Sequence, residues 1–224
     1  MMKKSFRNLF IALFTIFTII FISISLTYSW FIKTNESTFI IDTGEFSSSL
    51  AVAFNGSVIS SGSPYYDAQK KVVIVDAGNA LSTNHIGKLT VSLTITPEVT
   101  ARFRIKIQDE WRLKRTYIAL GTTIEEAISH ENGELIPGNA LFPFTIANIA
   151  NYTYDSQSGY FYYNLLLEKG QVYNISFITS GLSHPVVSNS VFNEECIVYL
   201  DFIVDIVQAN RFSEVWGISP DYFG

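Results

Sequence analysis

Apolar and polar residues alternate along most of the chain after residue 37, and this period of two constrains the fold more than any other feature. Successive side chains of a β-strand point to opposite faces of its sheet, so the alternation predicts strands with one buried and one solvated face. The clearest run is 88–96, and Pro97 ends it because proline cannot donate to a strand ladder. The other predicted strands are 50–54, 72–75, 102–108, 160–167, 172–178 and 196–207.

The spacing of these strands indicates the fold class. They follow one another at intervals of about ten residues, separated by stretches rich in Gly, Ser, Pro and Asn. Such a pattern is typical of an all-β fold, and we predict an antiparallel jelly-roll-like β-sandwich. Segment 196–207 is long and apolar enough to be a central strand.

One segment favours a short peripheral helix. Thr122 or Thr123 could cap residues 124–129, and Glu125 or Glu126 follows three residues later, as in a capping box. The remainder of the domain is expected to contain few helical residues.

The N-terminus has the features of an export signal. Lys3, Lys4 and Arg7 precede an apolar run, residues 9–26, in which Ser and Thr are the polar interruptions. As a helix this run would span about 27 Å, close to the ~30 Å hydrocarbon core of a bilayer. Its length therefore fits a cleaved hydrophobic signal helix and a retained anchor equally well.

The residues after this run favour cleavage. Thr27 and Ser29 place small residues at the two positions that a signal peptidase reads before Trp30. We expect a signal peptide (or membrane anchor) at 1–29 and one mature domain at 30–224. The protein would then be secreted or extracellular at the cell surface. We expect membrane contact only through the N-terminal segment, which would anchor the protein if it is not cleaved.

Composition excludes several functions. The net charge of -5, without a long basic run, argues against nucleic-acid binding. The single cysteine, Cys196, excludes an intrachain disulfide, and its place on the apolar face of a predicted strand indicates a small buried hydrophobe.

The outward row Arg102, Arg104 and Lys106 fits a solvated face that protects the sheet, or a contact with an acidic neighbouring copy.

The chain also has no familiar catalytic pattern. His130 and Glu131 begin like a zinc-protease helix, but the second ligand position holds Glu134, and Gly133 would break the helix. His130 is therefore expected in a loop. The sequence has no nucleophile elbow, phosphate-binding glycine loop or calcium loop. We predict no catalytic residues, no metal ligands and no cofactor.

Four groups of residues, in order along the chain, resemble the TasA/camelysin family of exported proteins, whose signals are cut by a SipW-type signal peptidase. The groups are 27–31 with Asn35, 37–39 and Gly44; 101–107; 159–163; and 207–210 with Trp216 and Gly217. The resemblance implies a jelly-roll subunit of extracellular biofilm-matrix fibres. It also implies self-association into filaments, in which the N-terminal strand of one subunit is inserted into the sheet of the next.

The candidate donor strand contains Trp30, Phe31, Ile32, Phe39 and Ile41. Strand addition satisfies the open backbone groups of a sheet edge, and a head-to-tail contact of this kind propagates as a filament. The same segment could instead pair within its own subunit as an edge strand.

Two other functions stay open. One is a membrane-anchored adhesion domain, and the other is a camelysin-like metallopeptidase. The missing zinc-ligand spacing argues against the metallopeptidase.

We predict that the exported protein begins at Trp30, because the small residues Thr27 and Ser29 precede it. Edman degradation or mass spectrometry of the secreted protein checks this. Recovery of the full-length chain alone, from the membrane fraction, would contradict cleavage.

Overall fold

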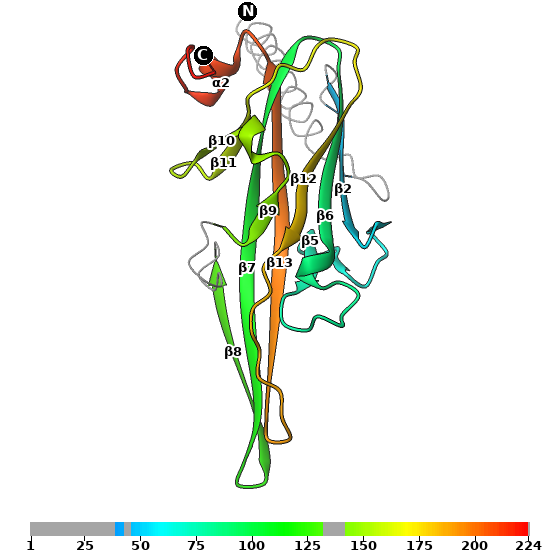
Figure 1. Ribbon diagram of the computed structural model, residues 1–224, viewed down its shortest axis with the longest axis vertical. Coiled ribbons are helices and arrows are strands. Elements are labelled where there is room, and N and C mark those ends of the chain that lie inside the picture. Colours follow the sequence, from blue (N-terminus) through cyan, green and yellow to red (C-terminus); the bar gives the residue numbers. More distant parts are fainter. Residues whose placement is uncertain (1–38, 43–45, 132–141, 224) are drawn as a thin grey trace, which may run out of the picture.

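The computed structural model describes residues 39–42, 46–131 and 142–223, and the expected signal segment lies outside these ranges. Two antiparallel sheets form a sandwich, which confirms the expected all-β fold (Figure 1). In the described ranges no helix has the length and apolar character that crossing a membrane requires.

The first sheet has six strands in the order β1-β2-β6-β12-β9, with β3 paired to the end of β2. Their bounds are β1 Phe39–Asp42, β2 Phe46–Phe54, β3 Ser57–Val58, β6 Leu89–Pro97, β9 Phe144–Ile146 and β12 Tyr173–Gly181. We call it sheet A.

The second sheet, sheet B, has seven strands in the order β10-β11-β7-β13-β5-β4, with β8 paired to β7. Their bounds are β4 Tyr66–Asp67, β5 Val72–Asp76, β7 Ala101–Ala119, β8 Thr122–Glu131, β10 Tyr152–Asp155, β11 Tyr160–Tyr163 and β13 Phe192–Gln208. β13 is central, as its sequence predicts, and pairs with β7 from Phe192↔Tyr117 to Gln208↔Ala101. The described helices are η1 Ile86–Lys88, η3 Ile149–Asn151 and α2 Phe212–Trp216.

The larger of two apolar clusters among the described residues lies between the sheets. The alternating apolar residues of β6 are at most 1% exposed: Leu89, Val91, Leu93 and Ile95. Aromatic rings join the two layers, because Phe177 of β12 contacts Phe161 of β11 with ring centroids 5.5 Å apart. Phe177 also lies 5.6 Å from the ring of Tyr152 in β10. The period of two therefore identifies the core face correctly.

The helix expected at 124–129 is wrong, because this segment belongs to β8. Leu120 and Gly121 join β7 to β8 with positive φ angles of 51° and 77°, the combination that a type I′ hairpin turn requires. Glu125 and Glu126 bond to side chains of β7 instead of capping a helix. The short peripheral helix α2 lies near the C-terminus, outside the segment expected to be helical.

The strand expected at 160–167 is also shorter, because β11 ends at Tyr163. The chain returns to β7 at Leu167, whose backbone exchanges two hydrogen bonds with Ala101.

Sheet B is longer than sheet A. β7, β8 and the first part of β13 extend past the sandwich as a narrow projection (Figure 1). We call this projection, residues 114–129 with 187–195, the β-finger. Its β8 strand is largely exposed, because sheet A does not reach it.

Replacing Phe177 with alanine should lower the free energy of unfolding by about 3–5 kcal/mol, because the ring is fully buried between the sheets. Urea denaturation measures the change. The matched control is Leu81→Ala, at a side chain that is 90% exposed, which should change stability by less than about 0.5 kcal/mol. Equal effects of the two substitutions would contradict the assigned core.

Candidate functional site

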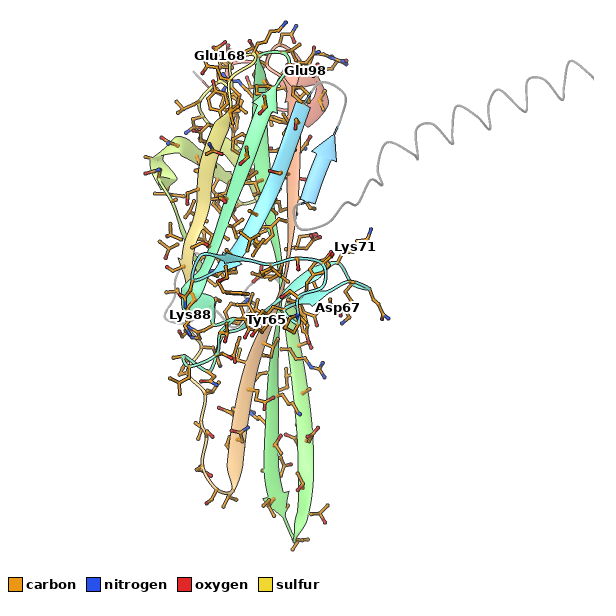
Figure 2. The ribbon with its side chains drawn as sticks, turned by 90° about the vertical axis from the view of Figure 1, so that its right-hand side faces the viewer. Tyr65, Asp67, Lys71, Lys88, Glu98 and Glu168 are labelled. Atoms are coloured by element: carbon orange, nitrogen blue, oxygen red, sulfur yellow. The ribbon has the colours of Figure 1, made fainter. Side chains whose placement is uncertain are left out.

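The edge of sheet A is the candidate assembly site. β1 lies outside β2 and pairs with it in the same chain, from Phe39↔Leu50 to Asp42↔Ser47 (Figure 2). Further along β2, the short strand β3 pairs with Ala53 and Phe54. β1 thus fills a four-residue slot on the β2 edge, where unpaired backbone groups would otherwise face solvent.

The structure places part of the candidate donor strand in this slot. Phe39 and Ile41 belong to β1. Trp30, Phe31 and Ile32 lie outside the described residues, as does the expected cleavage bond after Ser29. For residues 39–42 of a single chain, the observed arrangement is pairing within the subunit.

The β2 edge is firmly built without β1. On its other side β2 pairs with β6 along all nine of its residues, from Phe46↔Pro97 to Phe54↔Leu89. Its inward side chains, Phe46, Ser48 and Leu50, are 4–6% exposed. β2 is therefore held in place by β6, whichever strand occupies the slot on its other side.

A serine and a histidine meet at a second place, between β5 and the loop after β12. The Ser183 Oγ lies 3.1 Å from the His85 Nε2. The backbone of His85 forms a bridge to Asp76, so the sequence brings a hydroxyl, an imidazole and a carboxylate into one neighbourhood. Sequence reasoning did not identify this grouping, because Ser183 is 98 residues from His85 along the chain.

The hydrogen bonds give this grouping a structural role. The Gly87 N–H donates to the His85 Nδ1, so in the neutral ring Nε2 carries the proton and donates to Ser183. A base that activates a serine needs the opposite tautomer. The Asp76 carboxylate accepts the N–H groups of Gly78 and Asn79. His85 therefore caps η1 and ties it to the loop after β12.

Cys196 is fully buried on the core face of β13, as its position in the sequence predicts. Burial raises the pKa of its thiol to about 12, so it is a poor nucleophile at neutral pH. Nearby, Glu194 accepts the Val187 N–H and pairs with Arg115, and the first of these bonds is the main reason that its pKa is lowered. Within the described ranges no three His, Cys, Asp or Glu side chains are grouped as metal ligands.

His130 and Glu131 lie on β8, opposite Trp111 and Glu110 of β7. The expectation of a loop histidine is therefore wrong, and a strand cannot place two ligands one helical turn apart. Glu134 lies outside the described residues.

The basic row on β7 is not a solvated face. The Arg104 guanidinium pairs with Asp205 at 2.8 Å and lies 4.1 Å from the Tyr160 ring centroid and 5.0 Å from that of Trp216. The Trp216 indole N–H donates to the same carboxylate at 2.9 Å. Arg102 lies 3.8 Å from the Phe223 ring centroid. The C-terminal residues thus cover the outer face of sheet B, because aromatic faces attract the two guanidinium groups.

Comparisons with known proteins found no match: no protein-family model, no curated protein and no solved structure matches the chain. The resemblance to the TasA/camelysin family therefore rests on the sequence motifs.

Replacing His85 with asparagine should reduce the loss of stability at acid pH. Burial is the main reason that the His85 pKa lies below its usual 6.5. The stability that the neutral His85 contributes is therefore fully present above pH 6.5 and is lost as the pH falls through the folded-state pKa. Asparagine can still accept the Gly87 N–H but does not titrate. Urea denaturation at about pH 7 and about pH 5 should show a smaller decrease for the variant than for the parent chain. Identical decreases in the two proteins would show that His85 does not contribute to the pH dependence of the free energy of unfolding.

Proposed function

We propose that the chain is an exported structural subunit that assembles into fibres at the cell surface by N-terminal strand donation. The observation that carries this proposal is the position of β1. β1 is the first described strand, lies at the edge of sheet A and contains two of the candidate donor residues, Phe39 and Ile41.

Exchange of β1 between copies would conserve its backbone pairing. A strand from a second copy could occupy the β2 slot in the same register, from Leu50 to Ser47, with the same partners. Exchange of an identical element costs little, because the same backbone hydrogen bonds form between subunits as within one subunit. Residues 43–45 connect β1 to β2 along the chain.

The residues before β1 supply a reason for intermolecular pairing. A chain that begins at Trp30 carries Trp30, Phe31 and Ile32 at its free end. Burying a side chain of this size is worth about 1.5–3 kcal/mol, so the free end gains from a groove on a neighbour. An uncleaved signal would tether this end to the bilayer, and cleavage would act as the switch for assembly.

This proposal describes a structural protein, so it needs no catalytic residues and no cofactor. A SipW-type peptidase would release the mature subunit, and other copies of the chain would be its partners. The fibres would belong to the extracellular biofilm matrix, as the family resemblance suggests.

Purified protein comprising residues 30–224 should form filaments that electron microscopy detects, whereas a chain that begins at Asp42 should stay folded and monomeric. The shorter chain lacks the donor residues but keeps β2 and its pairing with β6. Circular dichroism checks that it is folded. Filaments that form equally well from the shorter chain would rule out strand donation.

A peptide experiment supplies the matched control. A peptide of residues 30–42 should bind the shorter chain, because it restores β1 in the empty slot. The same peptide with Phe39 and Ile41 replaced by serine should bind more weakly. Calorimetry measures both affinities, and equal affinities would contradict a specific donor strand.

A further inference from the structure

The turn at the tip of the β-finger has an unfavourable residue. Leu120 has a φ of +51° and is 106% exposed. Bulky residues rarely adopt a left-handed conformation, and type I′ turns prefer asparagine or aspartate before glycine. The fold therefore places an apolar side chain at a position where a polar residue would suit both the backbone and the solvent. Such strain is often found at functional sites.

The tip around Leu120 carries no charge. Residues 116–124 and 188–193 contain no Asp, Glu, Lys or Arg. The apolar side chains that these two segments expose by more than half are Ile118, Leu120 and Val191.

Polarity increases in layers behind the tip. Tyr117 stacks on Phe192 with ring centroids 6.4 Å apart, and three residues of extended strand put this layer about 10 Å from Leu120. The first charges follow the rings: Arg115 pairs with Glu194 at 2.9 Å, Lys114 pairs with Glu125 at 3.2 Å, and the Glu126 carboxylate accepts the Tyr117 hydroxyl at 3.0 Å. A protein that inserts an element shallowly into a bilayer needs this order, with apolar groups deepest, aromatic rings at the interface and charges in water.

The backbone of the tip is also suited to an apolar medium. The β7–β8 pairing continues to Ala119↔Thr122, next to the turn. The Ile118 N–H donates to the Val191 carbonyl, and the Asn189 side chain accepts the N–H groups of Val191 and Phe192. The backbone groups that make these bonds would keep them when the tip is buried.

We propose that the tip of the β-finger inserts into the interfacial region of a lipid bilayer, with Leu120 as its deepest side chain. A protein pocket fits the tip less well, because the apolar residues lie on both sides of the hairpin. Ile118 pairs with Thr123 on one face, the adjacent Tyr117 pairs with Ile124 on the other, and Leu120 lies at the apex. The fluid interior of a bilayer can contact both faces of the hairpin and its apex at the same time. The inserted tip is a second membrane contact, separate from the N-terminal segment, and does not depend on the proposed fibre.

A local fluorescent probe tests this insertion in the full-length chain. Thr123→Cys places an environment-sensitive dye such as NBD beside Leu120, at an exposed position. Cys196 should stay unlabelled, because it is buried and its pKa is raised to about 12. The control is Glu98→Cys, at the opposite end of the molecule from the β-finger (Figure 2).

With vesicles of phosphatidylcholine, the dye at residue 123 should shift to the blue and be quenched by nitroxide-labelled lipids, while the dye at residue 98 should not respond. Adding phosphatidylglycerol should leave the shift unchanged, because the tip is uncharged. Leu120→Asn should abolish most of the response while keeping or raising stability in urea, because asparagine favours this turn.

Three results would overturn the proposal. The first is no response at residue 123, and the second is an unchanged response in the Leu120→Asn variant. The third is a blue shift that grows with protein concentration and needs no vesicles, which would instead assign the tip to a contact with a second copy.

Discussion

The antiparallel ladder between β7 and β13 is the constraint on which the rest of the structure depends. Its register is marked near each end by an ion pair between directly opposite residues, Arg104 with Asp205 and Arg115 with Glu194. A slip of one residue would separate both pairs and turn the core face outward. Side chains on the inner face of the ladder form part of the core, and the C-terminal aromatic residues pack on its outer face. The part of the ladder that extends past sheet A belongs to the β-finger.

Much of this architecture could be predicted from the alternation of residues, because one buried face imposes a period of two. Three features could not. The strand β8 was not predicted, because its threonines and glutamates also fit the capping box of a helix. The hairpin turn before it was not recognised, because Leu120 is an unusual residue for a type I′ turn. The cover over Arg102 and Arg104 depends on aromatic residues about a hundred positions away, which local patterns cannot detect. The contact between His85 and Ser183 is equally non-local.

The candidate assembly site was easier to predict, because it is carried by one continuous segment near the N-terminus. Sequence reasoning identified Phe39 and Ile41 but left open where they pair, and the structure supplies the partner strand and the register. This site lies in sheet A, whereas the β7–β13 ladder lies in sheet B. A subunit could therefore exchange β1 without disturbing its main ladder, which makes a stable fold compatible with assembly.

The central claim, that a neighbouring copy fills the β2 slot in fibres, is tested most directly by a disulfide between Ile40→Cys and Ser49→Cys. These residues are directly opposite in the β1–β2 register, at a spacing that a disulfide can bridge. After oxidation of fibres assembled from residues 30–224, a non-reducing gel should show a ladder of covalent oligomers, because each bond would join two copies. Fibres whose disulfides all lie within single chains would contradict the account.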